Sequence, residues 1–160
     1  MEVESGVVLA VAGAVIAVVL GGIGSIFGVA LAGQAGTGVI SEKPELFGKI
    51  LLLQALPGTQ GIYGFLGALL ILINVGLIGG SPVAIDVSTG WQFFAAGIPV
   101  GLAGLISGIY QGKVSAAGLN SIAKNPANTG KAVIFAAMVE TYAVLGLLVS
   151  VLLIFGIKVA

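Results

Sequence analysis

The group in this chain best suited to chemistry is one carboxylate, Glu140, inside a long apolar stretch, residues 132–155. An ionised carboxylate is costly in hydrocarbon, so a Glu at that depth indicates a functional site with a partner. The partner must be a cation, a proton or a set of hydrogen-bond donors. Three more polar side chains lie deep in apolar stretches, and these are Thr59, Gln60 and Gln111.

The residues before Thr59 predict a break in a helix. Pro57 has no amide hydrogen and Gly58 follows it, so carbonyls near residues 53–56 should lose their helical partners. Freed carbonyls at membrane depth are tolerated where another group satisfies them. Tyr63 lies one turn beyond Thr59, so both side chains are expected on one face of the helix.

The polar groups form a set of hard oxygen donors: one carboxylate, two amide oxygens, one hydroxyl and one or more free carbonyls. The chain has no Cys and no His, which excludes the usual zinc and copper sites. A single carboxylate balances a single positive charge, which favours Na⁺ over Ca²⁺ or Mg²⁺. A proton would need only Glu140 and a donor or two, and it is the alternative. The polar groups could also form a hydrogen-bonded cluster that serves packing alone.

Composition predicts an integral membrane protein. The 160 residues are 58% hydrophobic and 8% charged, and the mean hydropathy is +1.21. Soluble domains carry about 25% charged residues, so there are too few polar side chains here to cover a surface in water. The net charge is zero, and no basic patch indicates binding to nucleic acid.

Apolar runs predict four transmembrane helices, at residues 5–37, 49–78, 89–122 and 130–157. Each run exceeds the ~20 residues that a helix needs to cross a bilayer, and none alternates as a barrel strand would. The first residues lack the basic start of a signal peptide, so the first run is interpreted as a retained helix. The expected connections are residues 41–48, 79–88 and 124–129.

The distribution of charge predicts the orientation. Four of the six lysines lie at the first and third connections, and these are Lys43, Lys49, Lys124 and Lys131. This bias puts those two loops in the cytoplasm and both termini on the other side, with Glu2, Glu4, Asp86 and Lys158. Lys113 is left inside the third run, where it should snorkel or face an interior other than plain lipid.

The two halves of the chain resemble each other, as internal repeats at about 5–78 and 89–157. One alignment, called here the proline register, pairs Pro44 with Pro126 and Gly48–Lys49 with Gly130–Lys131. Farther along the chain the alignment shifts to a tyrosine register, which pairs Tyr63 with Tyr142 and puts Gly61 in the place of Glu140. The shift implies three extra residues in the first copy. The chain is therefore predicted to be one four-helix unit, residues 1–160, made of two parallel helical hairpins.

Small residues recur every fourth position in the first and third runs, as Gly24, Gly28, Ala32, Gly36 and as Gly104, Gly108, Gly112, Ala116. Such rows let helix backbones approach closely. They predict either ordinary helix pairing or the crowded inner wall of a closed ring.

Three segments carry a resemblance to a known family: Leu56–Gly64, Gly108–Lys113 and Phe135–Ala143. They resemble the proteolipid of V-type and A-type rotary ATPases, and most of all its bacterial sodium-translocating form. The resemblance implies a homo-oligomeric rotor ring in the cell membrane, with Glu140 as the essential carboxylate. It also implies four further Na⁺ ligands and a latch on the carboxylate: Thr59, Gln60, Gln111, the backbone carbonyl of Leu56, and Tyr63 as the latch.

The resemblance implies partners too. A stator membrane protein would supply half-channels and a basic residue, and central-stalk subunits would dock at loops 41–48 and 124–129. No Gly-rich loop ending in Lys-Ser or Lys-Thr occurs, so the chain is expected to be a non-catalytic subunit.

Overall fold

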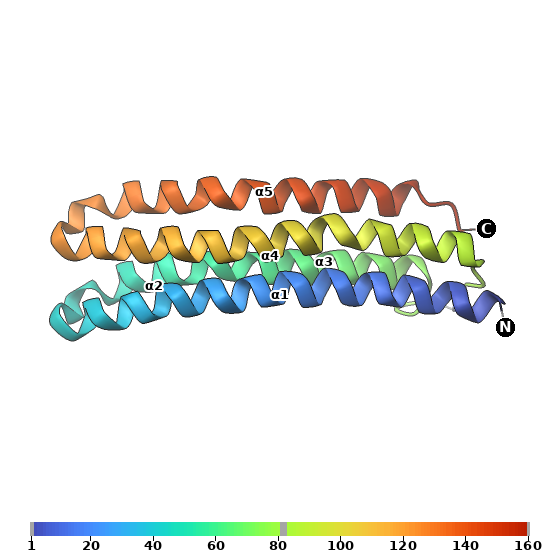
Figure 1. Ribbon diagram of the computed structural model, residues 1–160, viewed down its shortest axis with the longest axis horizontal. Coiled ribbons are helices and arrows are strands. Elements are labelled where there is room, and N and C mark those ends of the chain that lie inside the picture. Colours follow the sequence, from blue (N-terminus) through green and yellow to red (C-terminus); the bar gives the residue numbers. More distant parts are fainter. Residues whose placement is uncertain (1, 81–82, 160) are drawn as a thin grey trace.

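The computed structural model describes residues 2–80 and 83–159, with the side chains of residues 2–4 outside that description. The expected positions of the Glu2 and Glu4 charges therefore lie outside the described residues. Five α-helices form a long bundle (Figure 1), and they are α1 (Glu2–Glu42), α2 (Phe47–Ala55), α3 (Thr59–Asn74), α4 (Val87–Lys124) and α5 (Thr129–Gly156). Three short 3₁₀ turns join them, and these are η1 (Pro44–Leu46), η2 (Leu56–Gly58) and η3 (Pro126–Asn128).

The described residues contain four helical segments long and apolar enough to cross a membrane, because η2 joins α2 and α3 into one span. The spans are Ser5–Glu42, Pro44–Asn74, Val87–Lys124 and Pro126–Gly156. The prediction of an all-α membrane protein with four spans is confirmed. The chain is therefore a multi-pass membrane protein.

Two predicted boundaries were wrong. The first connection, expected at 41–48, is almost entirely helical, since only Lys43 separates α1 from η1. Hydroxyls of Thr37 and Ser41 donate to carbonyls four residues back, so polar residues here continue the helix. The second span ends at Asn74 rather than 78, because Gly76 takes φ 71° and closes a Schellman cap.

Helices α1 and α4 run parallel and pack backbone to backbone through their small residues (Figure 1). A Cβ on Gly24 would overlap the Gly104 carbonyl oxygen, and one on Gly28 would overlap that of Gly108. No side chain fits there, so the glycines set the spacing between the hairpins. Ordinary helix pairing within one copy therefore accounts for the central part of the two rows.

The two hairpins are equivalent in the proline register from the end of the first helix of each to the end of the second, at Asn74 and Gly156. The same offset of 82 relates the ends of α1 and α4 (42 and 124), the turns η1 and η3 (44–46 and 126–128), and the starts of α2 and α5 (47 and 129). Packing obeys it as well, because an added Cβ on Gly64 would meet the Ala17 carbonyl and one on Gly146 would meet the Pro99 carbonyl. The tyrosine register was therefore wrong, and Gly58 rather than Gly61 takes the place of Glu140.

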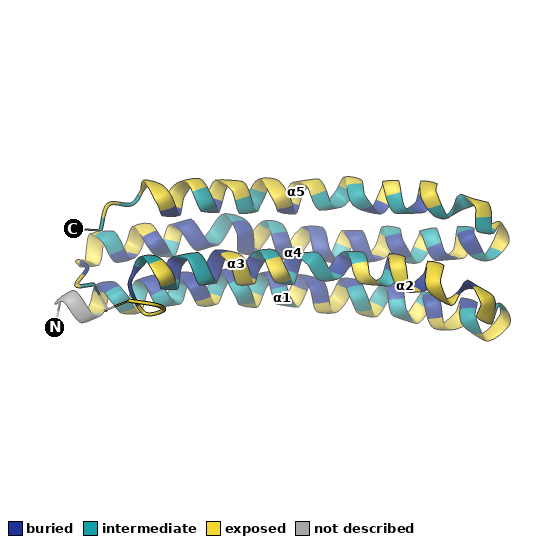
Figure 2. Cartoon of the chain, turned by 180° about the vertical axis from the view of Figure 1, so that it is seen from behind, coloured by how far each residue is buried: buried dark blue, intermediate teal, exposed yellow. Residues whose placement is uncertain are grey.

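Two apolar clusters lie along the bundle with a polar layer between them. One contains Ala68, Ile71 and Ile154, and the other contains Leu53, Ala132 and Ala136. In α5, Glu140 lies between Ala136 and Ile154 and belongs to neither cluster. Buried residues concentrate on α4, whereas α5 exposes much of its length (Figure 2). The described interior thus holds a layer of larger polar side chains between two mostly apolar clusters, and scattered serines such as Ser115 and Ser150 are buried outside that layer.

Candidate ion-binding site

The carboxylate of Glu140 on α5 is half-buried and accepts two hydrogen bonds from other helices. The Tyr63 hydroxyl on α3 donates to Oε1 at 2.7 Å, and Nε2 of Gln111 on α4 donates to Oε2 at 3.3 Å. Three helices therefore converge on one carboxylate. A polar group left unpaired inside the bundle is costly, so these bonds hold the three side chains against one another.

Two fully buried amides lie behind the carboxylate. Nε2 of Gln60 donates to Oε1 of Gln111 at 2.5 Å, and Nε2 of Gln111 also donates to the Ala136 carbonyl at 3.1 Å. Both glutamines have no solvent-exposed surface. A buried amide without partners is costly, so this pairing fixes the two side chains against each other.

The predicted break at Pro57 is present as η2, which separates α2 from α3. The Thr59 hydroxyl donates to the Leu56 carbonyl at 3.0 Å and lies 3.5 Å from Oε1 of Gln60. The carbonyl at the break is thus turned toward a side-chain hydroxyl next to the buried amides. This gives the polar layer two more oxygen atoms.

All six predicted site residues are brought together by the structure. Hydrogen bonds join Tyr63 to Glu140, Glu140 to Gln111 and Gln111 to Gln60. The Thr59 hydroxyl, which donates to the Leu56 carbonyl, lies 3.5 Å from Oε1 of Gln60. Among residues 2–80 and 83–159, no group of three or more His, Cys, Asp or Glu could hold a metal. One carboxylate amid neutral oxygens suits a singly charged hard cation or a proton. The role of each residue as a ligand remains a prediction.

Sequence reasoning missed two backbone contacts next to the site. One is the Ala136 carbonyl bonded to Gln111, and the other is the Gly61 amide, which donates to the Ser25 hydroxyl at 2.7 Å. Ala136 lies one helical turn before Glu140, and that spacing could have indicated its carbonyl. The Ser25 contact joins α1 to α3 and has no sequence signal.

Lys113 lies away from this layer. It is exposed on α4, and its Nζ stands 4.6 Å from the centre of the Tyr110 ring. No ion pair of Lys113 occurs among the described side chains, so it is no counter-ion for Glu140 in this structure.

The fold and the site together define a class: a membrane proteolipid of two repeated helical hairpins with one carboxylate in a polar layer. The chain belongs to the family of the ATP synthase C subunit, whose model matches residues 12–71 and again residues 94–153. The second match confirms the duplication of the hairpin.

Individual relatives narrow the class. The chain is 48% identical to the V-type sodium ATPase subunit K of Enterococcus hirae, over 94% of this chain and 93% of that one. It is 43% identical to the A-type ATP synthase subunit K of Methanocaldococcus jannaschii, over 94% of this chain and 63% of that longer one. It is 31% identical to the V-type proton ATPase 16 kDa proteolipid subunit of Chrysotila carterae, over 88% of this chain and 86% of that one.

These relationships make the chain a V/A-type ATPase proteolipid, a non-catalytic subunit of the membrane rotor ring. The predicted family and the absence of catalysis are confirmed. The relatives include both a sodium and a proton ATPase subunit, so family membership leaves the ion open.

Proposed function

We propose that this chain carries Na⁺ as one member of a homo-oligomeric rotor ring, with one ion bound at Glu140 in each copy. Further ligands would come from Thr59, Gln60, Gln111 and the carbonyl of Leu56. The observation that carries the proposal is the convergence of neutral oxygens, from two amides, one hydroxyl and one carbonyl, next to a single carboxylate. A proton site needs only the carboxylate and its donors, so it would make no use of the Thr59 and Gln60 oxygens as ligands.

The charge of Glu140 explains how such a ring could turn in lipid. A bare carboxylate is expensive in hydrocarbon, and a Na⁺ ion bound to it removes the net charge. The Tyr63 hydroxyl, 2.7 Å from the carboxylate, would hold the loaded site closed. The ion would enter through a half-channel of a stator protein and bind at Glu140. When the copy returns to the stator, a basic residue there would pair with Glu140 and displace the ion.

The lysine-rich end of the bundle is the proposed cytoplasmic end, in the cell membrane, with the termini on the other side. There, Nζ of Lys43 donates to the Ala123 carbonyl and Nζ of Lys49 to the Pro126 carbonyl at 3.4 Å. These bonds tie the two loops into one surface. Central-stalk subunits, which would couple rotation to ATP turnover, would dock on that surface.

The direct test is carbodiimide labelling of the purified ring, because carbodiimides modify protonated, accessible carboxyl groups. We expect Glu140 to be labelled, and we expect Na⁺ but not K⁺ to slow the reaction. Labelling indifferent to Na⁺ would overturn the sodium assignment and leave proton transport as the function.

A second measurement separates a rotor from a channel. Liposomes that contain only the purified ring should take up no Na⁺, since the half-channels belong to another protein of the complex. Uptake of radioactive Na⁺ by such liposomes would instead identify a self-contained transporter.

A further inference from the structure

The contact between the two hairpins inside one copy uses one particular side of each helix. Gly24 and Gly28 of α1 meet Gly104 and Gly108 of α4, so closely that added Cβ atoms would overlap the facing carbonyl oxygens. We call this contact the inner seam. Because the hairpins are equivalent in the proline register, each of these four positions has an equivalent on the opposite hairpin.

The equivalent positions are mostly large and exposed. Ile106 and Tyr110 on α4 correspond to Gly24 and Gly28, and these two side chains are 57% and 55% exposed. On α1, Gly104 and Gly108 correspond to Gly22 and to Ile26, which is 68% exposed. No described atom outside the helix itself lies within 4 Å of a Cβ built on Gly22. The Gly22 backbone lies close to Gly61 of α3, but the direction in which a side chain would point is open.

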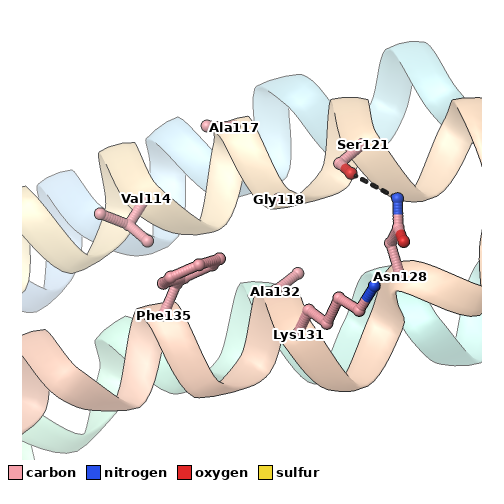
Figure 3. Close-up of a pocket in the computed structure, with 8 residues that line it drawn as sticks. All are labelled: Val114, Ala117, Gly118, Ser121, Asn128, Lys131, Ala132 and Phe135. Carbon is pink, nitrogen blue, oxygen red and sulfur yellow. Dashed lines mark hydrogen bonds between the residues drawn. The ribbon is translucent and has the colours of Figure 1, made fainter.

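The α4 positions lie along a groove between α4 and α5. Ile106, Tyr110 and Tyr142 line a hollow of about 370 Å³, and its walls are almost entirely apolar. A second hollow of about 620 Å³ follows toward the η3 turn, where Phe135 of α5 faces Val114 of α4 (Figure 3). An apolar groove between two transmembrane helices can face lipid or another helix, and the equivalence of the two hairpins favours a helix here.

We propose that Ile106 and Tyr110 of one copy dock against Gly22 and Ile26 of the next copy. The proposal rests on the ring assembly proposed above and adds its contact surface and register. Suppose that the second hairpin of one copy relates to the first hairpin of the next copy as the two hairpins relate within a copy. The α4 face that carries Ile106 and Tyr110 then meets the α1 face that carries Gly22 and Ile26. The open space at Gly22 receives Ile106, and Ile26 enters the hollow beside Tyr110. We call this contact the outer seam.

The outer seam differs from the inner seam in spacing. Glycine meets glycine inside a copy. Between copies, Ile106 meets Gly22, and Tyr110 meets Ile26, so at least one bulky side chain lies in each contact. The assembled ring therefore alternates close and wide contacts between its inner helices.

The outer seam lacks the carboxylate and the amides of the ion site. In the proline register, Gln60, Tyr63, Gln111 and Glu140 correspond to Tyr142, Leu145, Val29 and Gly58. No carboxylate and no amide remains among these four. Thr59 has an identical equivalent, Thr141, whose hydroxyl donates to the Met138 carbonyl at 2.7 Å. Without a carboxylate, these two oxygens cannot balance the charge of a bound cation, so the outer seam is not expected to hold one.

Cysteine crosslinking tests the register, because the chain has no native Cys. The double variant Ile26→Cys/Tyr110→Cys should give a ladder of covalent oligomers after oxidation or treatment with a short bis-thiol reagent. The control pair is Ile26→Cys/Ile134→Cys, since Ile134 is 63% exposed on α5 and its equivalent, Leu52, is 47% exposed and so does not face the other hairpin. No ladder with Tyr110, or equal ladders for both pairs, would overturn the proposal.

Native mass spectrometry of the same samples measures whether the ring is intact. It therefore separates a wrong contact surface from a wrong proposed function. An intact ring without the ladder rejects this seam and leaves the ring in place. The absence of any ring rejects both.

A second pair of variants tests the space at Gly22 without cysteines. Gly22→Leu should lower the fraction of assembled ring about tenfold, because overpacking one seam is strongly unfavourable. Gly38→Leu is the matched control, since Gly38 also lies on α1 with open space around an added Cβ. It should assemble as the wild type does, and equal losses in both variants would contradict the assignment of Gly22 to the seam.

Discussion

Replacing Gln111 by Leu should abolish most of the sodium affinity while leaving the helices intact. Gln111 is fully buried and makes hydrogen bonds to Gln60 at 2.5 Å and to Glu140 at 3.3 Å. Leucine removes one proposed cation ligand and leaves the Gln60 amide without its partner. A hydrogen bond to a charged group contributes ~1.5–3 kcal/mol, and an unpaired buried amide costs a further ~1–3 kcal/mol.

We expect a loss of roughly 3 kcal/mol in sodium binding, or about a factor of 100 in affinity, because part of the unpaired-amide cost is already present in the empty site. The assay is the Na⁺ concentration that halves the rate of carbodiimide modification of Glu140. The matched control is Gln34→Leu, the same chemical change at an exposed position on α1. Far-ultraviolet circular dichroism checks that both variants keep their helices. Half-protection of Gln111→Leu at the wild-type concentration would refute the reasoning and make Gln111 a packing residue.

Other predictions concern single contacts. Tyr63→Phe removes the 2.7 Å bond to Glu140, so carbodiimide should label the Na⁺-loaded site about tenfold faster, and an unchanged rate would exclude a latch. Gly28→Ala should destabilise the detergent-solubilised protein by ~1–3 kcal/mol, whereas Gly38→Ala, with open space, should stabilise it by ~0.5–1 kcal/mol in thermal melts. The Asp86 carboxylate caps α4 by accepting from a backbone amide, which lowers its pKa, so this stabilisation is present above about pH 4 and lost as pH falls through the lowered pKa. The thermal midpoint should therefore fall with acid more in the wild type than in Asp86→Asn, and parallel falls would contradict this.

Much of the fold could be predicted because the bilayer imposes length and polarity on each span. Long apolar runs indicated the four helices, and Pro57 indicated the break that the structure has as η2. The helix ends were harder to predict. Ser41 and Thr37 are polar and yet lie within α1, since their hydroxyls bond to the helix backbone and replace water.

The repeat was visible in sequence, but its register was not. The match of Tyr63 with Tyr142 suggested the tyrosine register for the second helix of each hairpin. That alignment was based on a short motif and not on the whole helix. Packing favours the proline register, because a Cβ added to Gly64 or to Gly146 would meet a carbonyl at equivalent positions of the neighbouring helix, Ala17 and Pro99. A contact of that kind tolerates no displacement along the helix.

The sequence by itself determined the kind of site: one carboxylate and a few neutral oxygens inside four apolar helices, with no soft ligand. Only the tertiary structure decided that these groups meet. Glu140, Gln111 and Tyr63 come from three helices, and their convergence depends on how α3, α4 and α5 are rotated against each other. Close glycine contacts constrain that rotation: those between α1 and α4, that of Gly64 of α3 with α1, and that of Gly146 of α5 with α4. Such contacts are properties of two surfaces that meet, and they cannot be read from either helix alone.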